Sequence, residues 1–195
     1  MTTYILAGGN DRSYESYSLE LSAVVLPWVI KPKVVSCFFS KDESEWAQAT
    51  INWEAWFKQY FGSSVEYRVA SPDNFLEDIA WADVVYFHGG NTLKLTTAMK
   101  AYTDIEETFE GKIVIGSSAG SNFLSGTYYS PSRDVIEKGS GIVDFAVIAH
   151  YGAAGDGDVL LDHAGWQDII NRTKSASPDE QILLIAEGTF VVIVK

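Results

Sequence analysis

Short apolar runs alternate along this chain with longer amphipathic stretches. Residues 4–7 and 33–39 are short and apolar, as expected of strands, and residues 64–70 predict a third strand. The stretches between them show helical spacing. In residues 43–61 large side chains recur at helical spacing, and Gly62 is well suited to end that helix. This alternation predicts a series of strand–helix–strand units.

Two further apolar runs, at residues 83–87 and 112–115, each end in a glycine-containing turn. Valine, isoleucine and phenylalanine follow one another in these runs without polar alternation. Such runs are typical of strands that are covered on both faces, and therefore of a parallel sheet. We expect an α/β fold in three layers, in which helices cover both faces of a doubly wound, mostly parallel sheet.

The pattern changes in the last third of the chain. Residues 143–149, 182–186 and 189–194 are apolar and predict three more strands. Gly188 lies at the turn between the last two, so we expect a C-terminal hairpin. Residues 151–158 are rich in glycine and aspartate, which is typical of a loop.

Composition limits the number of domains and the kinds of partner. A chain of 195 residues with 47% hydrophobic content can bury a sizeable core, and we expect one domain over residues 1–195. The formal net charge of -12 argues against nucleic acid and anionic membrane surfaces as partners. Cys37 is the single cysteine and lies within an apolar run, so we expect it to be buried and without a disulfide.

The remaining features bear on location and assembly. The first residues have no basic start followed by a long apolar run, as a signal peptide would, and no segment approaches the length of a membrane span. A cytoplasmic location is the default expectation. The tryptophans of residues 43–61 either fill the core or form a homodimer interface.

The segment KIVIGSSAGSNFLSG at residues 112–126 indicates a catalytic nucleophile. An apolar strand runs into Gly116-Ser117-Ser118-Ala119-Gly120 and then into residues that suit a helix, which is the setting of a nucleophile elbow. Ser118 is the predicted nucleophile. The small neighbours leave room for a tight turn, and the following helix directs free N–H groups toward a developing oxyanion. Acyl transfer is the first hypothesis.

A serine hydroxyl needs a base, and histidine is the side chain best suited to that task near neutral pH. The chain contains three histidines. His88 precedes a glycine pair, His150 ends a predicted strand and His163 lies in a stretch that looks helical. We expect His150 to be the base, because the carboxyl ends of the strands meet at the edge where the elbow lies.

The base needs an acid that fixes the tautomer of its imidazole. Glu187 and Asp134 are the candidates. Glu187 lies between two apolar runs, an unusual place for a carboxylate that lacks a partner. Asp134 lies in a polar segment where a solvated loop position is equally natural.

The loop at residues 88–92, HGGNT, offers backbone N–H groups at a second strand end. The N–H groups of Gly90 and Ala119 would form an oxyanion hole, with Gly89 and Asn91 contacting the substrate. The same loops, with residues 8–10, could hold phosphate instead. However, neither the Walker lysine–serine pair nor the dinucleotide fingerprint is present, and the histidines lack metal-ligand spacing. We therefore expect neither cofactor nor metal.

The order and placement of four blocks resemble the dipeptidase E and cyanophycinase family of serine peptidases. The blocks are FHGGNT at residues 87–92, GSSAGS at 116–121, His150-Tyr151 and AEGT at 186–189. The resemblance implies a fold like the class I glutamine amidotransferases and a small peptide as substrate. It also implies roles for three residues: Ser118 as nucleophile, His150 as base and Glu187 as acid. Asp134 falls near a family aspartate that has been a candidate for the acid.

The chain departs from the family pattern in two places. His88 stands where a third glycine usually precedes the asparagine, which would put a side chain beside the oxyanion hole. The basic motif that follows the histidine in aspartyl dipeptidases is replaced by the acidic residues 152–158. Because an acidic substrate side chain needs a cation to pair with, we do not expect a preference for an N-terminal aspartate.

Three readings follow from these observations. The first is a serine hydrolase that cleaves small peptides or isopeptides through an acyl-enzyme on Ser118. The second is a non-catalytic relative that binds a small molecule or a partner in the same cleft. The third is an esterase in which Asp134 is the triad acid, since the order serine, acid, histidine is that of the α/β-hydrolases.

Overall fold

The computed structural model describes residues 1–153 and 161–195. Most of the predicted acidic loop at residues 151–158 therefore lies outside the described residues. The strands are β1 (Thr3–Ala7), β2 (Lys33–Cys37), β3 (Glu66–Val69), β4 (Val84–Phe87), β5 (Ile113–Ser117), β6 (Thr127–Ser130), β7 (Val135–Lys138), β8 (Phe145–Ala149), β9 (Gln181–Ile185) and β10 (Phe190–Val194). The helices are η1 (Asp11–Ser13), α1 (Glu15–Val25), α2 (Glu43–Phe61), α3 (Phe75–Trp81), α4 (Thr92–Met99), α5 (Ile105–Thr108), α6 (Ala119–Leu124) and α7 (His163–Ala176).

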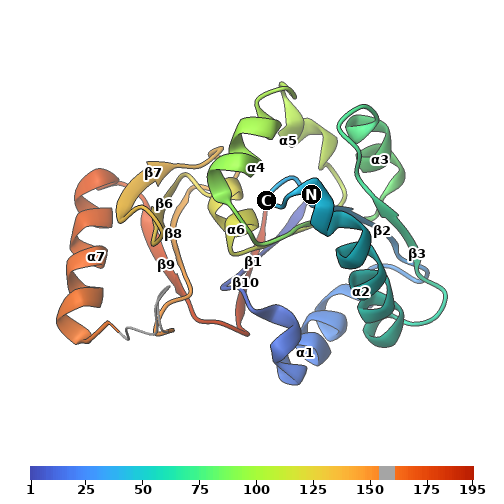
Figure 1. Cartoon of the computed structure of the whole chain (residues 1–195), viewed down its shortest axis with the longest axis horizontal. Helices are drawn as coiled ribbons and strands as arrows, with labels where there is room; N and C mark the ends of the chain where they lie inside the picture. Colours follow the sequence, from blue (N-terminus) through green and yellow to red (C-terminus); the bar gives the residue numbers. More distant parts are fainter. Residues whose placement is uncertain (154–160) are drawn as a thin grey trace.

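The strands form two sheets (Figure 1). The larger sheet has six strands in the order β10-β1-β5-β4-β2-β3, and all of its pairs are parallel except that of β1 with β10. The smaller sheet has four strands in the order β7-β6-β8-β9. The predicted mostly parallel α/β fold is confirmed. The separate smaller sheet was not predicted, because β6 and β7 are short and their sequence is rich in polar residues.

Helices cover both faces of the larger sheet, as the unalternating apolar strands predicted (Figure 1). On one face, Tyr17 of α1 and Phe57 of α2 pack in one buried cluster with Ile5 of β1. On the other face, Ile79 of α3 and Phe123 of α6 belong to a second cluster with alternate residues of the same strands. Helix α7 packs on the smaller sheet. This arrangement leaves the carboxyl ends of the parallel strands as the open edge of the sheet.

The predicted C-terminal hairpin is wrong. Strand β9 pairs in parallel with β8 in the smaller sheet, whereas β10 pairs antiparallel with β1 in the larger one. The turn between them carries the chain from one sheet to the other. Gly188 has a φ of 66° there, and a Cβ on it would lie 2.3 Å from Cγ of Tyr14. Two apolar runs around a glycine turn match a hairpin locally, but β10 pairs with β1 and β9 pairs with β8 instead of with each other.

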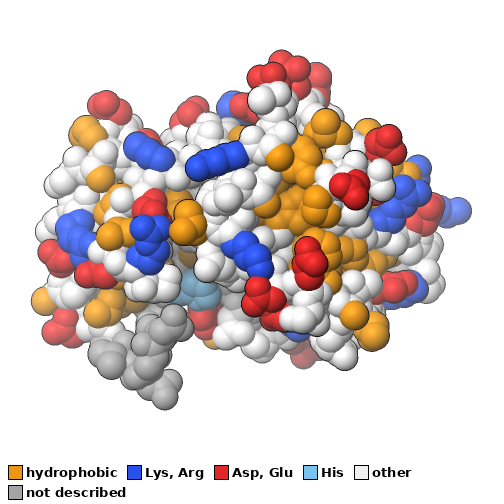
Figure 2. Space-filling model, turned by 45° about the horizontal axis from the view of Figure 1, so that its top comes forward, with side chains coloured by type: hydrophobic (Ala, Val, Ile, Leu, Met, Phe, Trp, Pro, Cys, Tyr) orange, Lys and Arg blue, Asp and Glu red, His pale blue; other side chains and the backbone are white. Residues whose placement is uncertain are grey.

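The aromatic residues of α2 mostly face inward. Trp53 and Trp56 are buried, so they do not form a surface for a second copy. Cys37 is also buried, as predicted, and burial raises the pKa of its thiol to about 12. Among the described residues, no helix has the length and apolar character needed to cross a membrane. On the face drawn in Figure 2, basic and acidic side chains are interspersed and form no continuous basic stripe.

Candidate active site

Ser118 occupies a sharp turn between a strand and a helix. Strand β5 ends at Ser117, α6 begins at Ala119, and Ser118 between them has φ 49° and ψ -105°. A Cβ on Gly116 would lie 2.6 Å from the carbonyl carbon of Gly120, and one on Gly120 would lie 2.2 Å from the Phe87 oxygen. The glycines at both ends of the motif are therefore required by close backbone packing. The geometry agrees with the nucleophile elbow that the motif predicted.

The strand register brings a third loop to this turn. Strands β1 and β5 are parallel, with Ala7 opposite Ser117. The backbone N–H of Ser118 donates a hydrogen bond to the Ala7 oxygen at 3.0 Å. The Gly8-Gly9-Asn10 segment that follows β1 therefore lies directly beside the serine.

His150 reaches the serine from the smaller sheet. It follows β8 with a φ of 58°, and its N–H donates to the Gly8 oxygen at 3.0 Å. Its ring lies close to Gly9, since a Cβ on Gly9 would be 2.4 Å from Cε1 of the imidazole. The Nε2 atom of His150 is 2.7 Å from Oγ of Ser118. A base and a hydroxyl at this distance share a hydrogen bond along which a proton can move.

Glu187 lies on the other side of the imidazole. Strands β8 and β9 run in parallel with Ala149 opposite Ile185, so the residues that follow them leave the sheet together. The Nδ1 atom of His150 is 2.7 Å from Oε1 of Glu187. Burial acts to raise the pKa of Glu187, but hydrogen bonds from Asn10 and His150 outweigh it and leave this pKa below its usual value. Glu187 is therefore ionised near neutral pH.

Asp134 and His163 lie apart from this group. Asp134 is in the turn between β6 and β7, where its side chain is 70% exposed and lies 2.8 Å from Nη1 of Arg172. The hydroxyl of Tyr129 donates to the same carboxylate at 3.2 Å. His163 begins α7 and is exposed. The structure brings together Ser118, His150 and Glu187, and it does not bring Asp134 to the histidine.

The loop after β4 faces Ser118. A Cβ on Gly89 would lie 3.4 Å from Cβ of Ser118, and one on Gly90, which has a φ of 144°, would lie 2.6 Å from the Ser40 oxygen. Among the described residues, the N–H of Gly90 has no hydrogen-bond partner. Ala119 is the first residue of α6, so its N–H has no partner within the helix. Both amides are available to a ligand.

Asn91 has a structural contact in this loop. Its Oδ1 accepts a hydrogen bond from the backbone N–H of Lys94 at 2.9 Å and so caps the first turn of α4. Asn91 also lines the cleft beside Ser118. Its side-chain oxygen is thus already engaged in the cap, and its backbone N–H donates to the Ser40 oxygen at 2.9 Å.

The expectation that the His88 side chain lies beside the oxyanion hole is wrong. His88 is 1% exposed and its Nε2 is 2.8 Å from Oγ of Ser36. It continues the alternation of Val84 and Tyr86, so it points to the face covered by α1 and α2. Desolvation, and to a smaller degree the charges of Lys41 and Arg12, lower the pKa of His88 well below its usual value.

A cleft of about 850 Å³ opens in front of Ser118 and His150. Its walls come from the start of α4, the β6–β7 turn and the start of α7, with Leu93, Tyr129 and Trp166 among the apolar side chains. Arg133 is a cation that lines the cleft, and its Nη1 is 2.6 Å from Oε1 of Glu137. The described part of the wall thus combines apolar and polar side chains, and Arg133 is paired with Glu137.

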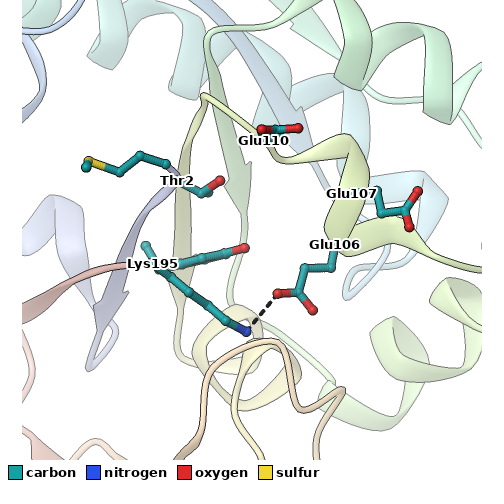
Figure 3. A pocket seen from close by; sticks show the side chains of 7 residues that line it. Thr2, Glu106, Glu107, Glu110 and Lys195 are labelled. Carbon is teal, nitrogen blue, oxygen red and sulfur yellow. Dashed lines mark hydrogen bonds and ion pairs between the residues drawn. The ribbon is translucent and has the colours of Figure 1, made fainter.

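A second hollow, of about 330 Å³, lies at the opposite edge of the larger sheet (Figure 3). It surrounds Thr2 at the amino end of β1, where Nζ of Lys195 pairs with Glu106 at 2.7 Å. It is separate from the cleft, which lies at the carboxyl ends of the strands. Among residues 1–153 and 161–195, no group of histidine, cysteine and carboxylate side chains could hold a metal ion.

The sequence model of peptidase family S51 matches residues 55–195. The chain belongs to this family. The match includes Ser118, His150 and Glu187, and membership makes the protein a serine-type peptidase. No curated protein sequence matches the chain.

Solved structures support the S51 fold. One is a peptidase from an acI-B1 Actinobacterium, with a TM-score of 0.59 and 19% identity over 99% of this chain and 83% of that one. Another is a putative peptidase E protein from Listeria monocytogenes EGD-e, with a TM-score of 0.59 and 15% identity over 100% of this chain and 99% of that one. At these identities the likeness concerns the fold of the S51 peptidase and not its substrate.

One residue of the site was not predicted from the sequence. The Nδ2 atom of Asn10 donates a hydrogen bond to Oε2 of Glu187 at 3.1 Å. The sequence of residues 8–10 predicts only a possible phosphate loop. An asparagine directly after a glycine pair at a strand end was the available signal, but nothing in the sequence indicated that Glu187 would lie opposite it.

Proposed function

We propose that this S51 peptidase hydrolyses small peptides or isopeptides through an acyl-enzyme on Ser118, with His150 as the general base. The observation that carries the proposal is the 2.7 Å distance between Ser118 Oγ and His150 Nε2, on a serine presented at a strained turn. In the first step the serine oxygen attacks the scissile carbonyl carbon while its proton moves to Nε2. The imidazolium then protonates the leaving amine, and the peptide bond breaks.

The oxyanion of the tetrahedral intermediate faces the free N–H groups of Gly90 and Ala119. Two backbone donors directed at this oxygen stabilise charge that is present only in the intermediate, which is how they lower the barrier. Water next attacks the acyl-enzyme, with His150 again as base, and Ser118 is released. Gly90 lines the cleft with a φ of 144°, and a Cβ on it would lie 2.6 Å from the Ser40 oxygen, so this conformation of the loop requires a glycine.

Glu187 is the acid of the proposed triad. Its Oε1 lies 2.7 Å from Nδ1, so it holds the proton on Nδ1 and leaves Nε2 free to accept the serine proton. It also stabilises the imidazolium when it forms. Asp134 has Arg172 and Tyr129 as its partners, and this argues against the esterase arrangement.

The charges of the cleft bear on the substrate. An acidic side chain at the N-terminus of a substrate needs a free cation, and the arginine among the described lining residues is paired with Glu137. We therefore expect neutral dipeptides to be cleaved at least as well as those that begin with aspartate. The apolar side chains of Leu93, Tyr129 and Trp166 in the same cleft support this specificity.

Turnover of a dipeptide library by the pure protein tests this function, with Ser118→Ala as the matched control. We expect hydrolysis by the wild type that is lost in the control, and no large preference for aspartate. Binding of peptides without turnover by either protein would favour the non-catalytic relative. A strong preference for aspartyl substrates would show that another cation binds the carboxylate of the substrate's aspartate.

A further inference from the structure

The loop that follows β1 contacts the turns that carry both the histidine and the acid of the site. The carbonyl oxygen of Gly8 accepts the N–H of His150 at 3.0 Å, and that of Gly9 accepts the N–H of Gly188 at 3.0 Å. The loop thus links the end of β8 to the turn between β9 and β10. Residues 8–10 precede the region that the family model matches, which begins at residue 55.

The side chain of Asn10 extends this link to the reacting groups. Its Nδ2 donates to Oε2 of Glu187 at 3.1 Å, and its Oδ1 accepts the hydroxyl proton of Ser13 at 2.9 Å. An ionised carboxylate can only accept hydrogen bonds, so the NH₂ end of the amide must face Glu187, and the oxygen end is left to accept from the Ser13 hydroxyl. Both ends of the amide therefore have a defined partner.

We propose that Asn10 is a positioning residue that holds Glu187 in the orientation required by His150. This inference rests on the proposed function. A carboxylate that accepts one hydrogen bond can rotate about it, whereas one whose two oxygens are both engaged keeps its plane. With Oε2 held by Asn10, Oε1 faces Nδ1 of the imidazole at 2.7 Å. Asn10 lines the cleft, and through this hydrogen bond it acts on the base by way of the acid.

The loop is also built to keep Asn10 in place. Asn10 has a φ of 57°, a left-handed conformation that asparagine adopts more readily than most residues. The next residue, Asp11, is 4% exposed, and its carboxylate accepts a hydrogen bond from the hydroxyl of the buried Tyr86. Asn10 is therefore fixed to the core on one side and to Glu187 on the other.

The decisive variant is Asn10→Gly, which removes the amide and still tolerates the left-handed backbone. We expect kcat to fall on the order of tenfold, with KM little changed and with the thermal midpoint close to that of the wild type. Asn52→Ala is the matched control. Asn52 accepts a side-chain hydrogen bond from Gln48 at 3.1 Å on α2, away from the cleft, so its loss should leave kcat unchanged.

Two readouts separate positioning from a general structural role. In a Glu187→Gln background, Asn10→Gly should cause little further loss of kcat, because the Glu187 carboxylate through which Asn10 acts on His150 is already absent. In the proton NMR spectrum, the low-field resonance of the His150 Nδ1 proton should weaken or shift in Asn10→Gly and stay unchanged in Asn52→Ala. Losses that multiply in the double variant, or an unchanged resonance, would overturn the inference.

The outcome also distinguishes this inference from the function on which it rests. If a fluorophosphonate labels Ser118 equally fast in the wild type and in Asn10→Gly, the positioning role fails and the serine hydrolase stands. If the probe labels neither protein, while both are folded, the proposed function and the positioning role fail together. Slower labelling of Asn10→Gly alone is the expected result.

Discussion

His150 and His88 occupy equivalent places in their strands and have opposite environments. Each directly follows a buried strand at the carboxyl edge of a sheet. The His150 side chain is 34% exposed and lies between Ser118 and Glu187, whereas His88 is 1% exposed and packs against the rings of Tyr86 and Trp53. One histidine borders the cleft, and the other belongs to the core.

The difference arises from backbone direction and not from the residue type. His88 keeps the alternation of β4 and points its side chain into the layer beneath α1 and α2. His150 turns out of β8 with a φ of 58°, which redirects its ring across the edge of the sheet. A histidine at a strand end is therefore a candidate base only where the backbone leaves the alternation of its strand.

The largest expected effect is the loss of peptide turnover when His150, the histidine that borders the cleft, is replaced. His150→Asn tolerates the left-handed backbone and removes the base, so peptide turnover should fall on the order of a thousandfold or more. Ser118→Ala should give a similar loss, and the double variant should be no worse. Steady-state kinetics on the best dipeptide measure this. Retention of more than about a tenth of the wild-type rate by His150→Asn would exclude it as the base.

The two candidate acids give the next contrast. Glu187→Gln keeps the shape of the side chain but removes the charge that stabilises the imidazolium, so we expect kcat to fall on the order of a hundredfold. Asp134→Asn, in the exposed β6–β7 turn, is the matched control and should leave kcat within about twofold. The reverse pattern would restore the esterase arrangement, with Asp134 as acid.

His88 should matter for stability more than for chemistry. Truncating a buried ring surrounded by aromatic side chains leaves a cavity, so His88→Ala should lower the free energy of unfolding by about 2 kcal/mol or more. His150→Asn, at the edge of the cleft, should lower it by less than about 1 kcal/mol. Urea denaturation followed by circular dichroism gives both values. Equal losses would contradict the assignment of the two histidines to core and cleft.

The pH dependence of stability gives the smallest and most specific contrast. Desolvation lowers the pKa of His88 well below its ordinary value of 6.5, so below pH 6.5 the folded state keeps this ring neutral while the unfolded state takes up a proton. The part of the unfolding free energy that depends on the neutral His88 ring is fully present above pH 6.5. As the pH falls below 6.5, this part is lost at up to about 1.4 kcal/mol per pH unit. His88→Phe should remove this slope between about pH 6.5 and 5. An identical slope in wild type and variant would show that other groups cause it.

The sequence predicted the chemistry of the site better than its surroundings. The turn at Ser118 could be predicted from its motif alone, because Gly116 and Gly120 allow backbone contacts that no other residue permits. His150 and Glu187 were placed by the ends of apolar runs and by the family resemblance. Local patterns of this kind are visible in a single sequence.

What the sequence did not reveal depends on contacts between distant segments. The turn at Gly188 matches a hairpin locally, yet β10 pairs with β1 from the other end of the chain. The hydrogen bond from Asn10 to Glu187 spans 177 residues and exists only because the two sheets meet there. The side chain of His88 points inward because it continues the alternation of β4. The glycines that follow His88 suggested a loop position instead, so the sequence did not predict this direction.

The most direct test of the account is covalent labelling of the folded protein with a fluorophosphonate, followed by mass spectrometric mapping of the modified residue. We expect a single adduct on Ser118 in the wild type, with labelling that is greatly slowed in His150→Asn and unaffected in Asp134→Asn. Folded wild-type protein that leaves Ser118 unmodified, or that labels equally fast without His150, would contradict the claim that this serine is activated by this histidine.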